Sequence, residues 1–430
     1  MLSVAVYILI IICLFLSVMK YPPVALAALL CLFALKQWAQ SVNAFFSLHG
    51  TLTNYLVASI VIVALVVMFF RNKPILASYP PAGWLVLALF SYSLMSILWV
   101  SNPEITYKVW LIELPYIITI ILLSPLLISS TESISEGLMA FLPLGTLLAL
   151  LLLFTSKWTD RGVELMGISR LRSQGNPLAV AEMAGYLMSA VVLLNFKGKW
   201  RTWQFLRWFI AAACLALAAK SGSRGQFFTM MLAAAVYLPM SRRITNPLHV
   251  VVLIVGLTFL AILGDWAFHS FSTAGDLRWQ TAKMQQDVSG RFTAAFKLLE
   301  VWYKSPSAIM FGLGNSASFD PSIIGFYPHV VPLEILGEEG IVGFFLFLTS
   351  IGITLRSIFR SYKIVRFDSS KRGILAVIGA IFSFELLLCL KQGSMFGSPY
   401  LFAFMIILGK YELLLVSEQK QVARLASDAI

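Results

Sequence analysis

The run "LSVAVYILIIICLFLSVM", residues 2–19, contains no charged side chain. A hydrocarbon layer about 30 Å thick is crossed by roughly 20 apolar residues in a helix, so this run is long enough to span a membrane. No basic segment precedes it and no small-residue cleavage pattern follows it, so we interpret it as a retained span. Similar runs recur along the chain without the alternation of a transmembrane β-strand. The sequence therefore predicts an all-α integral membrane protein.

The composition supports this class. The chain has 430 residues, of which 59% are hydrophobic and 12% charged, which is too apolar for a soluble domain. Its four cysteines all fall inside apolar runs without paired or ligand-type spacing, so we expect neither disulfides nor zinc. The net charge of +12 lies mostly in short loops, where positive-inside orientation explains it better than nucleic-acid binding does.

Hydropathy predicts about 12 spans (12–13), and the short second run decides between the two numbers. The orientation of the N-terminus depends on the same choice. The candidate spans are 2–19, 23–37, 54–70, 82–99, 107–128, 137–155, 176–195, 204–220, 225–240, 248–266, 340–360, 373–390 and 396–416.

The basic loops orient these spans. Those near 197–201, 242–243 and 356–372 are predicted to be cytoplasmic, together with the C-terminal tail. Alternation then sets the opposite side of the membrane. The loops that it places outside are 156–175, 220–224, 267–339 and 391–395.

This reading divides the chain into three parts. Residues 1–266 form the first part of the transmembrane bundle, 267–339 a large outer loop, and 340–430 the last spans and a short cytoplasmic tail. A polar stretch as long as the loop is usually functional or disordered, and its many aromatic residues argue against disorder.

Part of the large outer loop is predicted to be a helix at the membrane surface. Within "RFTAAFKLLEVWY", apolar residues recur at helical spacing, which is typical of an amphipathic helix. The residues of this predicted apolar face are Phe292, Ala295, Phe296 and Leu299.

Several cations fall on the predicted outer side. Arg170 and Arg172 precede one span, Lys220 and Arg224 flank a turn too short to leave the interface, and Arg291 begins the loop helix. The planar guanidinium suits two-point contact with phosphate oxygens, so the pattern favours a phosphate-bearing lipid headgroup as ligand. The same side chains could equally anchor helix ends to lipid phosphates.

His329 lies between two prolines in "GFYPHVVPLEILGEEGIVGFF", residues 325–345. Pro332 suits the first turn of a helix, because its missing N–H would be unpaired there in any case. The imidazole would then lie beside a helix N-terminus, whose partial positive charge lowers its pKa. A neutral histidine can accept a proton from an attacking hydroxyl. The alternative is an interfacial histidine held by local hydrogen bonds.

Two more side chains are possible substrate ligands. Glu334 could orient His329 or bind a sugar hydroxyl, although a carboxylate in a first turn also stabilises the helix dipole. Lys391 lies at the outer end of a span, where charge often marks function. No Walker loop, HExxH or GxSxG pattern and no Asp-rich metal site occurs, so we expect metal-free chemistry without a cofactor.

Four stretches together resemble the O-antigen ligase and polymerase superfamily of bacterial polytopic glycosyltransferases. "SGSRGQFF" is similar to the family's Ser-Arg-Gly turn, and "SGRFTAAFKLLEVWYKSPSAIMFGLGNS" to its Gly-Arg helix and Gly-x-Gly segment. "YPHVVPLEILGEEGIVG" resembles its Tyr-Pro-His-Asn, Leu-Glu and Glu-x-Gly pattern, and "RSQGNPLAVAEMAGY" the start of its central spans. One departure is Val330, where the family often has Asn.

The resemblance implies about twelve transmembrane helices with a large periplasmic loop, in the bacterial inner membrane. It also implies a metal-independent, inverting transfer of a glycan from undecaprenyl diphosphate. Arg224 and Arg291 would hold the diphosphate, and His329 would be the base that deprotonates the acceptor hydroxyl. The acceptor would be lipid A-core for a ligase or a growing glycan for a polymerase, with membrane lipid as the further partner. The motifs do not separate these two activities.

A transporter or flippase of lipid-linked saccharide is the competing class, since it too would need outward-facing arginines. It predicts polar residues through the membrane midplane and paired broken helices. The polarity of this sequence concentrates on one face instead, which favours the enzyme.

Overall fold

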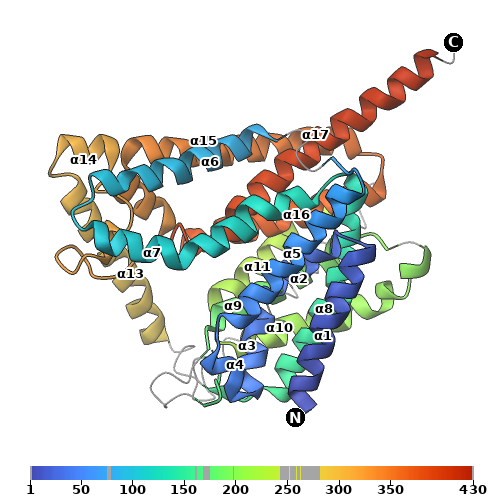
Figure 1. Ribbon diagram of the computed structural model, residues 1–430, viewed down its shortest axis with the longest axis horizontal. Helices are drawn as coiled ribbons and strands as arrows, with labels where there is room; N and C mark the ends of the chain where they lie inside the picture. The colour runs from blue at the N-terminus through green and yellow to red at the C-terminus, as the bar shows by residue number, and fades with distance from the viewer. Residues whose placement is uncertain are drawn as a thin grey trace. The chain divides into compact units, whose positions relative to one another are not determined.

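The computed structural model describes residues 2–74, 79–159, 162–167, 175–196, 198–242, 251, 258, 262 and 281–428. In these residues the chain is almost entirely helical, with one small antiparallel sheet of β1 (Trp158–Thr159) and β2 (Gly162–Val163) (Figure 1). It divides into two compact units, each described by itself.

The first unit comprises Met1–Ile75, Leu126–Lys283 and Val365–Phe384. Its helices are α1 (Leu2–Lys20), α2 (Val24–Leu30), α3 (Leu32–Val42), α4 (Ala44–Leu48), α5 (Leu52–Phe70), α8 (Thr131–Thr155), α9 (Pro177–Leu193), the 3₁₀ turn η4 (Gly198–Trp200), α10 (Trp203–Lys220), α11 (Arg224–Ser241) and most of α16 (Ser369–Cys389).

Helix α9 is the centre of the first unit. Fourteen of its 17 residues are buried, because α3, α8, α10 and α11 pack around it. A helix that is apolar on every side must be enclosed in this way. A Cβ atom on Gly185 would lie 2.6 Å from the Phe384 ring, so glycine is what allows α16 to approach.

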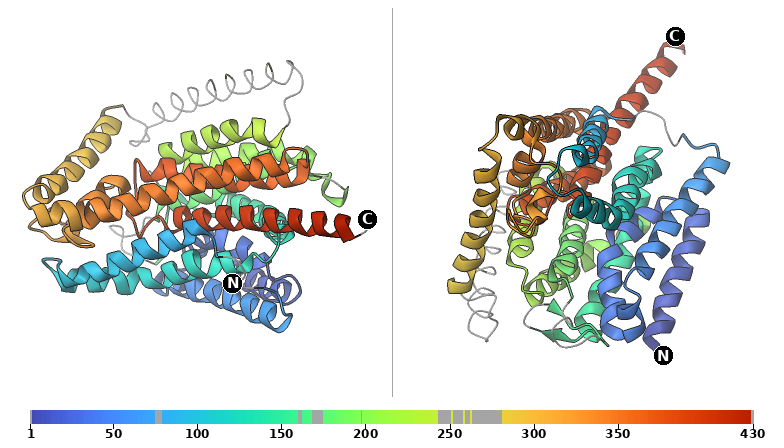
Figure 2. Two further views of the ribbon diagram at one scale, coloured as in Figure 1. Left: turned by 90° about the horizontal axis from the view of Figure 1, so that it is seen from above. Right: turned by 60° about the vertical axis from the view of Figure 1, so that its left-hand side comes forward.

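The second unit comprises Leu76–Pro125, Met284–Ile364 and Glu385–Ile430. Helix α17 lies against α6 and η2, and its last turns are exposed (Figure 2). The elements of this unit are α6 (Pro81–Met95), η1 (Ser96–Leu98), α7 (Pro103–Tyr116), η2 (Ile117–Leu123), η3 (Ser124–Leu127), α13 (Thr281–Trp302), α14 (Pro306–Phe311), η6 (Ala317–Phe319), α15 (Val331–Val365) and α17 (Pro399–Asp428).

Two helices of the second unit are irregular for identifiable reasons. Pro115 lies inside α7, and its missing N–H and bulky ring interrupt the hydrogen-bond ladder just before η2, which is a π-helix. The main-chain oxygen of Pro125 is then satisfied by the buried Nζ of Lys410 at 3.0 Å. Helix α15 breaks at Gly340, whose φ of 65° lies in the left-handed region, so it consists of two arms, 331–339 and 341–365.

These helices make the chain an all-α, multi-pass membrane protein. Within the described residues, eight helices are long and apolar enough to cross a membrane, or nine if the bent pair α2 and α3 forms one span. The eight are Ser3–Lys20, Leu52–Phe70, Pro81–Leu98, Pro103–Leu127, Thr131–Thr155, Val331–Val365, Ser369–Cys389 and Pro399–Leu425.

The predicted number of 12–13 spans is not confirmed. The run 23–37 is bent by 58° between α2 and α3, and 176–195 forms only the 17-residue α9, which is about 25 Å long at 1.5 Å per residue. The runs 204–220 and 225–240 form α10 and α11, which are not among the eight. Most of 248–266 lies outside the described residues.

The loop helix predicted from "RFTAAFKLLEVWY" is present as part of α13, and its predicted apolar face is only partly buried within the protein. Ala294, Ala295 and Leu298 are buried, whereas Phe292 and Phe296 are exposed. The small alanines allow close packing against the loop's neighbours, while the two aromatic rings remain outside. Their exposure agrees with a helix that presents apolar side chains to a membrane surface.

The Gly-x-Gly turn at Gly312 and Gly314 is packed against the first arm of α15. The N–H of Leu313 donates to the Gly337 carbonyl at 3.0 Å, and the N–H of Gly314 donates to the Glu338 carbonyl at 2.9 Å. A Cβ atom on Gly312 would lie 2.0 Å from the Glu338 oxygen, and Gly312 has a φ of 84°. Glycine is therefore required here by both space and backbone conformation.

We expect Gly312→Ala to destabilise the protein by about 2–4 kcal/mol, because the new methyl group overlaps the α15 backbone and the left-handed conformation disfavours alanine. Gly352→Ala is the matched control, since no atom lies within 4 Å of a Cβ atom at that helical position. Thermal unfolding of both purified variants in detergent measures the difference. Equal melting temperatures would contradict this account of the turn.

Candidate functional site

His329 lies immediately before α15 in an unusual backbone conformation. Its φ is 64°, in the left-handed region that costs a residue with a Cβ atom about 1–2 kcal/mol. Such strain persists only where the surroundings fix it, and it concentrates at functional sites. The buried Pro328 precedes the residue, and the buried Val330 and Val331 lead into the helix. Both sides of the strained residue are therefore anchored.

The imidazole is half-buried among aromatic rings. The ring centroid of Tyr327 lies 4.2 Å from that of His329, in an edge-on arrangement, and that of Phe326 lies 6.3 Å away. Burial lowers the pKa of His329 below 6.5, and the positive charge of Arg291 lowers it further. The sequence led us to expect a lowered pKa, from the helix N-terminus and from nearby arginines. The structure shows Arg291 as such an arginine and adds burial as the larger cause.

Arg291, on α13, is fixed beside the histidine by a main-chain contact. Its Nη1 donates to the carbonyl oxygen of Lys391 at 2.8 Å. This contact uses one of the five N–H donors of the guanidinium. Arg291 therefore has a set position, and its charge acts on both His329 and Tyr327.

Glu334 holds the same turn of the chain from the other side. Its carboxylate is buried and accepts a hydrogen bond from the N–H of Met395 at 3.1 Å. The turn that follows α16 is thus fixed at two points, Lys391 and Met395, by α13 and α15. The contact with Met395 is a structural role that the sequence did not indicate, and the proposed role of Glu334 toward substrate stays a prediction.

The next two carboxylates hold the loop that leads to His329. The buried Glu338 accepts from the N–H groups of Ser316 at 2.7 Å and Ser318 at 3.0 Å. Glu339 accepts from the side-chain amide of Asn315 at 3.0 Å. Although Glu334 and Glu338 are four residues apart on one helix, they therefore hold different segments of the chain.

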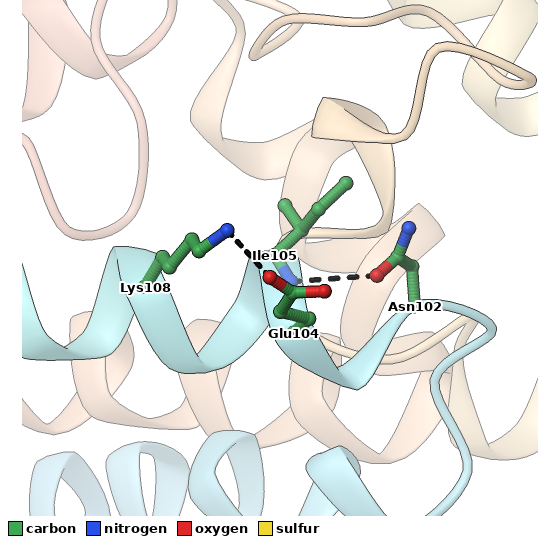
Figure 3. Close-up of polar contacts among 4 residues, drawn as sticks. All are labelled: Asn102, Glu104, Ile105 and Lys108. Carbon is green, nitrogen blue, oxygen red and sulfur yellow. Dashed lines mark hydrogen bonds and ion pairs between the residues drawn. The ribbon is translucent and has the colours of Figure 1, made fainter.

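Two residues on either side of the α6–α7 turn, Ser96 in η1 and Thr106 in α7, also hold this loop. The hydroxyl of Thr106 donates to the Asn315 carbonyl at 2.7 Å, and the N–H of Asn315 donates to the Ser96 hydroxyl at 2.7 Å. Figure 3 shows how α7 begins here: the Asn102 side chain accepts from the Ile105 N–H at 3.4 Å, and the exposed pair Glu104 and Lys108 lies 2.6 Å apart.

The other predicted site residues lie in the first unit or outside the described residues. Arg224 is half-buried and begins α11 in the first unit, after the left-handed Gly222. Lys220 ends α10 in the same unit, where its Nζ lies 5.5 Å from the Trp158 ring. Arg170 and Arg172 lie outside the described residues. The roles given to these four residues therefore stay predictions.

Sequence reasoning missed three features of the site: the left-handed backbone of His329, the ring of Tyr327 against it, and the contact between Arg291 and the 391–395 turn. The only local signal was the placement of His329 between Pro328 and Pro332. The contact of Arg291 joins residues 100 positions apart, and no local pattern reveals such a pairing.

We expect Arg291→Gln to raise the pKa of His329, because removing a nearby positive charge makes the imidazolium less unfavourable. The pKa should stay below 6.5, since burial, the larger cause, remains. Arg291→Lys keeps the charge and is the matched control. Histidine NMR titration of the protein in nanodiscs, with the His329 signal assigned by its loss in His329→Gly, measures the change. An unchanged pKa in the Gln variant would contradict the proximity of the two groups.

Comparison with known proteins adds no identification: no family model matches the sequence, and no curated protein matches it. The likeness to O-antigen ligases and polymerases is therefore carried by the quoted motifs alone.

Proposed function

We propose that this protein transfers a glycan from a polyprenyl-diphosphate donor to an acceptor hydroxyl at the outer face of a bacterial inner membrane. The observation that carries the proposal is the pairing in one unit of His329, with a lowered pKa, and the fixed cation Arg291. A neutral imidazole can remove a proton, and a fixed guanidinium can hold phosphate oxygens. The motif resemblance supports the same chemistry.

The reaction balances with these two groups. The acceptor oxygen attacks the anomeric carbon and loses its proton to the His329 imidazole, while the bond from the anomeric carbon to the diphosphate oxygen breaks. The electron pair of that bond leaves on the diphosphate, whose added charge Arg291 stabilises. Attack opposite the leaving group inverts the anomeric configuration. Arg224 is proposed as a second diphosphate ligand.

The position of Arg291 suggests an order of events. In the free protein its charge weakens His329 as a base, which by itself would oppose catalysis. A bound diphosphate would offset that charge and raise the pKa of His329 toward the working pH, where a general base is most effective. The histidine would then become a competent base only when the donor is in place.

We expect geranyl diphosphate, a short donor mimic, to raise the pKa of His329 in the wild type and to have little effect in Arg291→Gln. Titration of the same histidine NMR signal with and without the ligand measures both values. Geranyl alcohol is the matched control, because it keeps the lipid and lacks the charge. A pKa that falls or does not move when the diphosphate binds the wild type would contradict the proposed order.

We expect His329→Ala and His329→Gly to reduce glycan transfer at least about 100-fold, the usual contribution of a general base. Because glycine tolerates the left-handed backbone, the free energy of unfolding of His329→Gly should be about 1 kcal/mol higher than that of His329→Ala. Equal losses of transfer in the two variants would then reflect lost chemistry and not lost stability. His49→Ala is the control, since His49 is exposed and belongs to the first unit. Wild-type kcat/KM should fall as the pH drops through the lowered pKa of His329 in the free protein, and kcat should fall at a higher pH, through the pKa that the bound donor has raised.

One reconstituted assay tests the class of protein as well. Liposomes containing the purified chain receive a polyprenyl-diphosphate-linked glycan with either a lipid A-core acceptor or a second lipid-linked repeat unit. A new glycosidic bond to the first identifies a ligase, and to the second a polymerase. Movement of the donor across the bilayer without a new bond would identify a flippase and overturn the proposal.

A further inference from the structure

A groove of about 710 Å³ opens in the second unit beside the candidate site. It lies between the α6–α7 turn and the segment that runs from the end of α13 to the loop after η6. We name it the Trp99 groove. The side chains that give it its chemistry are Trp99, Ser101, Ser305, Ser307, Phe311 and Ser322.

The two aromatic side chains of the groove are held in place by one residue behind them. The ring of Tyr92 lies 5.7 Å from that of Trp99, and its hydroxyl donates to the main-chain oxygen of Phe311 at 2.8 Å. Trp99 is nevertheless 38% exposed and Phe311 52% exposed. Trp99 therefore offers an accessible ring that packs against Tyr92, and Phe311 an accessible ring on a main chain that Tyr92 holds, so that binding orders little of the backbone.

The hydroxyl groups of the groove are also positioned. Ser305 and Ser307 lie 2.8 Å apart, oxygen to oxygen, and the Ser322 hydroxyl donates to the Asp320 carboxylate at 2.7 Å. A hydroxyl that donates to one partner can still accept from another. Among the described residues that line the groove, none is charged. Aromatic faces with serine hydroxyls suit the C–H faces and hydroxyl groups of an uncharged sugar.

A chain of contacts connects the Trp99 groove with His329. Ser322 lies in the turn that follows η6, where the N–H of Gly325 donates to the Ser318 carbonyl at 3.0 Å. The ring of Phe319 in η6 lies 6.2 Å from that of Tyr327, which in turn contacts His329. Ser322, at one side of the groove, and His329 therefore belong to one loop, whose first part is held by Glu338.

We infer that the Trp99 groove binds an uncharged sugar unit of the glycan, which stacks on Trp99 and hydrogen-bonds the serines. The inference rests on the proposed function. It adds that the two parts of the donor bind at different places: the diphosphate at Arg291 and the sugar in the uncharged Trp99 groove. It assigns to this groove the recognition of neutral rather than acidic sugars.

Saturation-transfer NMR tests this with soluble sugars that carry neither lipid nor phosphate. A neutral N-acetylglucosamine trimer should receive saturation from the full chain in nanodiscs, and a galacturonic acid trimer should bind at least about tenfold more weakly. Trp99→Ala should weaken binding of the neutral trimer about tenfold, as expected for one aromatic stacking contact, and Trp99→Phe should restore part of it. Trp84→Ala is the matched control, because Trp84 is a 62% exposed tryptophan on the preceding helix, α6, and does not line the groove.

The outcomes separate this inference from the proposed function. His329→Ala should bind the neutral trimer as the wild type does, since binding needs no proton transfer. Three outcomes would overturn the inference: unchanged binding of the neutral trimer in Trp99→Ala, equal binding of the acidic trimer, or no binding of either trimer to the wild type. If wild-type transfer is observed while these sugars do not bind, the proposed function stands and the sugar site is wrong. If the neutral sugar binds specifically but no glycan is transferred, the sugar site stands and the proposed enzymatic function is wrong.

Discussion

The carboxylate of Glu338 holds the loop that precedes α15 in the second unit, residues 315–329. Its oxygens accept from the N–H groups of Ser316 and Ser318, while its own main-chain oxygen accepts from Gly314. Burying a carboxylate is unfavourable unless such donors satisfy it, and two main-chain donors at normal distances do so here. Because the loop continues through Ser322 to His329, both the Trp99 groove and the histidine depend on this one group. Gly340 ends the arm that carries it.

The class of fold was readable from the sequence because hydropathy measures composition over about one membrane thickness. Its irregularities were not. The bend between α2 and α3, the π-helix after Pro115 and the break at Gly340 all depend on which main-chain groups find partners, and hydropathy averages over them. Pro115 was visible in the sequence, yet a proline alone predicts a disturbance without saying which form it takes. Of these three, the bend between α2 and α3 decides between eight and nine spans among the described residues.

The site was predictable to the extent that it is local. His329 and Arg291 were both chosen from short patterns, and the structure brings their charges close enough to interact. Glu334 and Lys391 were chosen for their charge, but Glu334 serves as an acceptor for Met395, and Lys391 contributes its main-chain oxygen. Such roles arise from contacts over tens of residues. The left-handed backbone of His329 is equally hidden, because only its fixed neighbours make that conformation persist.

In the second unit the cation Arg291 lies on α13, whereas the side chains that give the uncharged Trp99 groove its chemistry are carried by other elements. A groove lined by cations would bind the diphosphate as well as the sugar, and the donor would then bind in more than one register. If Arg291 holds the diphosphate and the uncharged Trp99 groove holds the sugar, as proposed, only one orientation of a lipid-linked sugar would satisfy both. His329 contacts Tyr327, whose ring lies 6.2 Å from that of Phe319 in η6, a few residues before the groove residue Ser322. In the proposed reaction, a base at His329 would accept the proton of the acceptor hydroxyl while the diphosphate leaves toward Arg291.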